Sequence, residues 1–130
     1  MFNHEEYLSK TDSMSFEEAI EIYNDLSKGI DLNDETSIEL YSSLIKSAVK
    51  YVEIRNRWLY LSKEEKEVID STRTSLHNAY MSNLAPLSRY MQKVGKDVSW
   101  HEKLISGNES RKRLGDFAGY LLCINSIVAR

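Results

Sequence analysis

Residues 109–128 read ESRKRLGDFAGYLLCINSIV, and they give the strongest indication of fold class in the chain. The apolar residues recur at intervals of three and four, which is the period of an α-helix. They also spread over much of the helix circumference, which is typical of a helix in the interior of a bundle. The pattern therefore predicts a central helix that other helices cover. Its apolar residues are Leu114, Phe117, Ala118, Leu121, Leu122, Ile124 and Val128.

Two glycines lie inside this predicted helix, four residues apart. Each of them, Gly115 and Gly119, costs up to about 1 kcal/mol relative to alanine in a helix interior. We therefore expect another backbone or a bulky ring to pack closely against both positions.

Polar residues border the apolar face of the same helix. Arg113 and Asp116 lie at i and i+3, so we expect them to form a partly buried charge-assisted pair. His77 or Tyr80 of the preceding long helix would share its hydrogen bonds. We interpret the cluster as a structural network, with a ligand or partner site as the alternative. The candidate site residues are Arg73, His77, Asn78, Arg113, Asp116 and Tyr120.

Capping signals place two helices before the middle of the chain. Ser15 and Glu18 have the spacing of a capping box, so a helix is predicted over 16–28. Gly29 is expected to end it in the left-handed conformation. Asn33 or Asp34 can cap the next helix, whose apolar stripe runs over residues 35–60.

A second capping box, from Ser62 to Glu65, predicts that the chain reverses near Leu61 and starts an antiparallel helix. One continuous helix across this point is the alternative. The third helix should end at Gly95. Pro86 lies inside it and should kink or interrupt it, and we expect a kink. Residues 95–108 read as a loop with one short helical turn at Trp100.

These signals together predict an all-α fold, a helical bundle of about four main helices with a kink near Pro86. No strand-like alternation persists anywhere in the chain. A length of 130 residues is typical of one domain, so residues 1–130 are expected to fold as a single unit. Residues 1–14 precede the first capping box and are expected to be flexible or loosely packed.

Charge divides the chain into two parts. Residues 1–40 hold eleven acids and two bases, a balance of −9, whereas residues 41–130 hold fifteen bases and nine acids, a balance of +6. Either the acidic part neutralises a mildly basic body, or one of the two surfaces meets an oppositely charged partner.

Several kinds of function lack a sequence signal. His4, His77, His101 and Cys123 do not have the spacing of metal ligands, so no metal site is expected. Cys123 lies in an apolar run and is expected to be a buried, inert thiol. The five glycines are scattered, which disfavours a phosphate loop and leaves no cofactor to expect. We therefore predict that the protein is not an enzyme.

Location and membrane contact can also be inferred from composition. No apolar run approaches the roughly 18 residues of a membrane span, and the N-terminus lacks the basic region of a signal peptide. A single cysteine fits a reducing compartment. We therefore predict a cytoplasmic protein without membrane contact.

Basic residues could form a stripe for nucleic acid. Arg111 to Arg113 open the last helix, while Lys46, Lys50, Arg55 and Arg57 lie on the second long helix. The sequence pI near 5.6 disfavours binding to nucleic acid, so a solvated helix face is the preferred interpretation.

The stretch from Leu76 to Arg130 resembles small helical proteins of unknown function from Gram-positive bacteria and their phages. The resemblance lies in Leu76 to Ala79, in Arg89-Tyr90 and in Arg111 to Ala118. It implies a bacterial or phage origin and assigns no activity to any residue.

The leading functional prediction is a non-enzymatic protein that docks one helix face, or its acidic N-terminal part, on a protein partner, with self-association as a further option. The alternatives are a nucleic-acid-associated regulator that uses the basic stripe and a small-ligand binder or enzyme near His77 and Asp116.

Overall fold

The computed structural model describes residues 4–107 and 109–128, and these residues form six helices without any strand. The all-α prediction is confirmed: α2, α3, α4 and α6 are the four main helices, and α1 and α5 are short. In chain order the helices are α1 (His4–Ser9), α2 (Phe16–Lys28), α3 (Glu35–Trp58), α4 (Lys63–Lys93), α5 (Ser99–Leu104) and α6 (Ser110–Val128).

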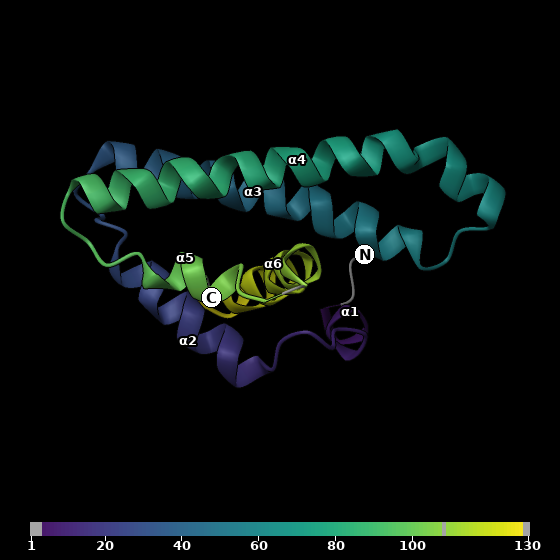
Figure 1. Ribbon diagram of the computed structural model, residues 1–130, viewed down its shortest axis with the longest axis horizontal. Helices are drawn as coiled ribbons and strands as arrows, with labels where there is room; N and C mark the ends of the chain where they lie inside the picture. Colours follow the sequence, from purple (N-terminus) through teal and green to yellow (C-terminus); the bar gives the residue numbers. More distant parts are fainter. Residues whose placement is uncertain (1–3, 108, 129–130) are drawn as a thin grey trace.

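The two longest helices, α3 and α4, form an antiparallel hairpin that makes one layer of the molecule (Figure 1). The chain reverses after Trp58 because a capping box starts α4. The backbone N–H of Glu65 donates to Oγ of Ser62 over 3.2 Å, and the Ser62 N–H donates to Oε1 of Glu65 over 3.1 Å. The predicted reversal is therefore confirmed, and the single continuous helix is excluded.

Side chains cap the first turns of α2 and α3, whereas α5 starts at Val98 without a side-chain cap. Ser15 caps α2 by accepting from the Glu18 N–H, and Asp34 caps α3. The prediction that Gly29 is left-handed is wrong, since its φ is −83°. A Cβ at Gly29 would lie 2.8 Å from Sδ of Met91, so close packing with α4 explains the glycine instead. Gly95, after α4, does adopt a φ of 82°.

Pro86 lies inside α4, and the helix runs through it from Lys63 to Lys93. Of the two sequence-based alternatives, a kink or an interruption, the interruption is excluded.

Helix α6 lies at the centre of the second layer, beneath the α3–α4 hairpin, and is seen nearly end-on in Figure 1. It contacts α1, α2, α3 and α5, which confirms its predicted central place. Cys123 is half-buried rather than buried. The Val128 side chain lies outside the described residues. The fully buried apolar residues of α6 include Leu114, Phe117, Ala118 and Leu121.

Two side chains of the N-terminal segment belong to the core. Tyr7 of α1 is 4% exposed and Met14 is 5% exposed, and α1 packs against α6. Residues 1–3 lie outside the described part of the chain. No helix among the described residues has both the length and the apolar character needed to cross a bilayer.

Candidate functional site

Asp116 is a buried carboxylate on α6 that joins three parts of the chain. Its Oδ1 accepts from Nη1 of Arg55 on α3 over 2.9 Å. Its Oδ2 accepts from the hydroxyl of Ser13 over 2.5 Å and from the Ser13 backbone N–H over 3.2 Å. Each oxygen is thus satisfied, which is what burial of a carboxylate requires.

Tyr7 of α1 completes this arrangement. Its hydroxyl donates to the carbonyl of Gly115 over 2.9 Å and accepts from Nη1 of Arg55 over 2.8 Å. Burial raises the pKa of Tyr7 to about 12, so the hydroxyl keeps its proton at neutral pH. We call Tyr7, Ser13, Arg55 and Asp116 the Asp116 network.

The predicted pair between Arg113 and Asp116 is wrong, because Arg113 has other partners. Its guanidinium donates to the carbonyls of Leu104 (3.1 Å), Lys103 (2.8 Å) and Ser13 (2.9 Å), and it pairs with the carboxylate of Glu18. The backbone of Ser13 therefore bridges the two charges: its carbonyl accepts from Arg113 while its N–H donates to Asp116. Sequence spacing along α6 could not reveal this bridge.

His77 and Tyr80 lie elsewhere, against α3. Their rings pack on the ring of Tyr51, with centroids 5.3 Å and 5.8 Å away respectively. Atoms Nε2 of His77 and Oη of Tyr80 are buried without a hydrogen-bond partner. The expectation that one of these residues shares hydrogen bonds with Asp116 is wrong, since Asp116 binds Arg55 of α3 and Ser13 instead.

The predicted cluster thus divides into two groups. Arg113, Asp116 and Tyr120 bind the N-terminal segment, and the Tyr120 hydroxyl donates to the carbonyl of Met14 over 3.2 Å. Arg73 and His77 lie on α4 and contact α3, where Arg73 stands 4.1 Å above the ring of Trp58. Asn78 is exposed and borders His77.

Sequence reasoning missed Tyr7, Ser13 and Arg55 as members of this site. The two glycines of α6 indicated close-packed groups where Tyr7 and Arg55 lie, and no signal indicated Ser13. A Cβ at Gly119 would overlap the Tyr7 ring, and a Cβ at Gly115 would lie 2.6 Å from Cζ of Arg55. The prediction that a bulky ring packs against the glycine is therefore confirmed at Gly119, where the ring is that of Tyr7. At Gly115 the group is a guanidinium.

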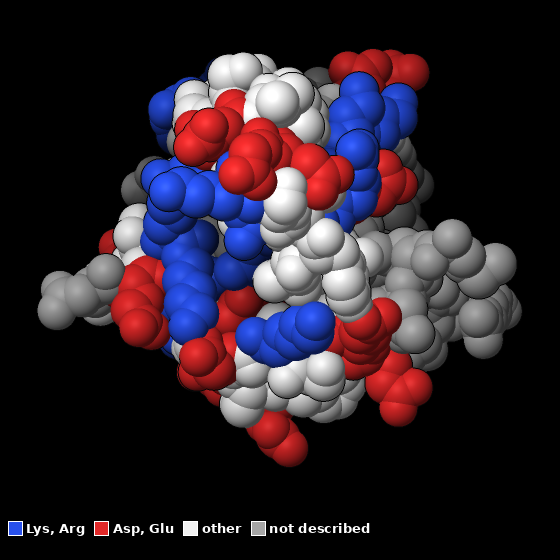
Figure 2. Space-filling view, turned by 90° about the vertical axis from the view of Figure 1, so that its right-hand side faces the viewer, with Lys and Arg blue, Asp and Glu red and all other residues white. Residues whose placement is uncertain are grey.

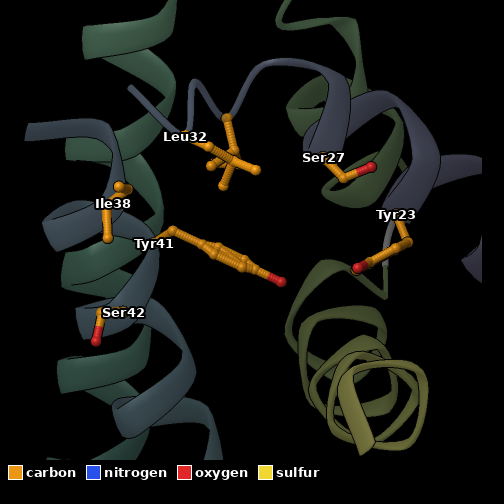
Figure 3. Close-up of a pocket in the computed structure, with 7 residues that line it drawn as sticks. Tyr23, Ser27, Leu32, Ile38, Tyr41 and Ser42 are labelled. Carbon is orange, nitrogen blue, oxygen red and sulfur yellow. The ribbon is translucent and has the colours of Figure 1, made fainter. Parts of the chain in front are cut away.

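An apolar groove of about 470 Å³ lies between α2 and α3. Figure 3 shows Tyr41 extending from α3 across the groove toward Tyr23 of α2, with Leu32 of the connecting loop beside it. The Tyr41 hydroxyl donates to Oδ1 of Asn125 over 2.9 Å, which fixes this ring to α6. The α2–α3 groove is lined by Tyr23, Ser27, Ile30, Leu32, Ile38, Tyr41 and Ser42.

Two apolar side chains of the α2–α3 groove are exposed to solvent, Leu32 at 81% and Ile38 at 41%. Acidic residues are frequent in this part of the sequence, since residues 19–40 contain six acids and a single base, Lys28. Asp31 precedes Leu32 and Glu39 follows Ile38, and both are exposed. The groove therefore combines an apolar lining with exposed acids adjacent to Leu32 and Ile38 in the chain.

No three His, Cys, Asp or Glu side chains converge as metal ligands within residues 4–107 and 109–128. Comparison of the chain with protein-family models, with curated proteins and with solved structures found no match.

Proposed function

We propose that this protein is a non-enzymatic interaction protein that docks an apolar segment of a protein partner, flanked by basic residues, in the α2–α3 groove. One observation carries the proposal: Leu32 is 81% exposed at the edge of a groove whose floor is apolar. A leucine held in water beside further apolar surface is typical of a docking site for an amphipathic helix or loop.

Charge defines the chemistry of the partner. Asp31, Glu35 and Glu39 are exposed acids that lie next to, or one helical turn from, the groove residues Leu32 and Ile38 in the chain, and we call them the acidic margin. A partner with Lys or Arg on either side of its apolar anchors would be attracted to this margin, and acidic partners would be repelled. The proposal includes a cytoplasmic location in a bacterium or a phage-infected cell, supported by the single cysteine and by the resemblance of Leu76 to Arg130.

The test uses two labelled amphipathic helical peptides, one of Leu and Lys and its counterpart of Leu and Glu, with binding measured by fluorescence anisotropy. We expect the Leu/Lys peptide to bind, and Leu32→Glu or Ile38→Glu to weaken it by at least about tenfold, because an apolar anchor is lost. These substitutions add negative charge, so binding driven by charge alone would become tighter instead.

Val68→Glu is the matched control. Val68 is 79% exposed on α4 and does not line the groove, so this variant should bind the Leu/Lys peptide as the unmodified protein does. Equal binding of both peptides, equal loss in the control, or no binding of the Leu/Lys peptide would contradict the proposal. Sedimentation of the protein alone adds one outcome: a dimer that Leu32→Glu dissociates would assign the groove to self-association rather than to a partner.

A further inference from the structure

A second surface feature lies where α3, α4 and the first turn of α6 meet. It is an open hollow of about 380 Å³, distinct from the α2–α3 groove, with three arginines and one lysine in its wall. Figure 2 views the end of the molecule at which α4 begins and shows Lys and Arg side chains gathered there in a patch with Asp and Glu at its edges. The basic hollow is lined by Tyr51, Arg55, Arg73, Glu109, Ser110, Arg111 and Lys112.

Two of these bases are already neutralised within the fold. Arg55 pairs with buried Asp116 over 2.9 Å, and Lys112 pairs with the carboxylate of Asp12. Both ion pairs help to attach the N-terminal segment. Arg55 and Lys112 therefore shape the wall of the hollow and do not offer free donors to a ligand.

The other two bases, Arg73 and Arg111, keep unused hydrogen-bonding capacity. The nearest carboxylate oxygen to Arg73 belongs to Asp70 on the same helix, 3.5 Å away, and Nε of Arg73 is buried without a partner. The Arg111 side chain forms no hydrogen bond or ion pair with another described residue. Stacking on Trp58 at 4.1 Å holds the Arg73 guanidinium in place, which reduces the entropy that a ligand must overcome.

His77 is buried between α4 and α3, and the charges of the basic hollow affect its pKa. Burial lowers its pKa, a hydrogen bond with Asn78 opposes this, and the positive charges of Arg111, Arg73 and Arg55 lower the pKa further. The three arginines therefore contribute a positive potential at His77. The N-terminus of the 19-residue helix α6 adds to it, because its first backbone N–H groups point outward along the helix axis.

We propose that the basic hollow binds a compact phosphate-bearing anion, such as an oligophosphate, through Arg73 and Arg111. Guanidinium groups match phosphate oxygens in geometry, and the hollow has room for a group of this size. Asp12 and Asp70, which pair with bases of the hollow, and Glu109, which lines it, would repel a long polyanion that extends beyond the hollow. This favours a small ligand over a nucleic-acid backbone.

Calorimetric titration with inorganic tripolyphosphate at low ionic strength tests the proposal, with a single-stranded oligonucleotide in parallel. We expect one saturable site per chain. Arg73→Gln and Arg111→Gln should each weaken it by at least about tenfold, because each removes a charged donor. Arg111→Gln is the sharper variant, since no described contact of its side chain is lost with it. Tripolyphosphate should also move the ring signals of His77 in an NMR spectrum.

Lys46→Gln supplies the matched control. Lys46 is an exposed base on α3 that does not line the hollow, so its removal should leave tripolyphosphate binding unchanged. Circular dichroism confirms that each variant is folded. Three results would overturn the proposal. Equal loss of binding in the control would show diffuse electrostatic attraction, and tighter binding of the oligonucleotide would assign the surface to nucleic acid. Absence of tripolyphosphate binding would show that the hollow takes no such anion.

Discussion

Asp116 is the residue on which α3, α6 and the N-terminal segment converge. It is 1% exposed, and both of its oxygens have partners. A buried carboxylate of this kind contributes little net stability while its partners are present, yet leaves costly unpaired groups when one partner is removed. The network therefore specifies how three parts of the chain fit together, which apolar contacts alone would specify less sharply.

A double-mutant cycle on Arg55→Met and Asp116→Leu measures this coupling by urea unfolding. Asp116→Leu alone should lower the free energy of unfolding by roughly 3–5 kcal/mol, because it strands the Arg55 charge. The double variant should lose less than the sum of the two single variants. Asp70→Leu breaks the exposed pair with Arg73 and should cost at most about 1 kcal/mol. A coupling energy of zero between Arg55 and Asp116 would refute a buried, interdependent pair.

At the scale of elements, the contact between α1 and α6 depends on glycines that weaken α6 as a helix. The ring of Tyr7 occupies the space where a Cβ of residue 119 would lie. The cost of a glycine in the helix interior is offset by burial of this ring and by its hydrogen bond to the Gly115 carbonyl. Helix propensity and tertiary packing thus oppose each other here, and packing prevails.

Gly119→Ala should therefore destabilise the protein by about 1–3 kcal/mol through overpacking, despite the better helix propensity of alanine. The same change in a Tyr7→Ala background should instead be neutral or stabilising by up to about 1 kcal/mol, since the ring is gone. Thermal and urea unfolding of the four proteins provide the comparison. Destabilisation of equal size in both backgrounds would show that Tyr7 is not the cause.

At the scale of the whole molecule, charge and burial together set the response to pH. His77 is buried and faces Arg55, Arg73 and Arg111, and its pKa lies below the ordinary value of 6.5. The unfolded chain therefore takes up a proton before the folded protein does as pH falls. The contribution of His77 to the free energy of unfolding is therefore fully present above its ordinary pKa. This contribution is lost as the pH falls through the ordinary pKa to the lowered pKa of the folded protein.

We expect the free energy of unfolding to decrease as the pH falls through the ordinary histidine pKa of 6.5, and His77→Gln to reduce that decrease. His101 should contribute in the same direction, because burial lowers its pKa as well. His101→Gln should remove a separate part of the decrease, so the two variants combined should flatten the profile most. An unchanged profile in His77→Gln would show that His77 titrates alike in both states.

The sequence by itself determined the helices, because their caps and periodicity depend on neighbours only a few residues away. The capping box at Ser62 is formed as predicted, Ser15 caps α2 by accepting from the Glu18 N–H, and the apolar stretch of α6 lies at the centre. Its two glycines also indicated that bulky groups would pack there.

Only the tertiary structure decided which charged groups meet. Arg113 and Asp116 are three residues apart and suggested a pair, yet Asp116 binds Arg55 and Ser13, which are 61 and 103 residues away in the chain, and Arg113 binds the Ser13 carbonyl, 100 residues away. The exposure of Leu32 and the gathering of Arg73 with Arg111 likewise depend on how α2, α3, α4 and α6 are arranged. Helix periodicity assigns a side chain to a face of its own helix, whereas its partner is fixed by the packing of helices, to which residues far apart in the chain contribute together.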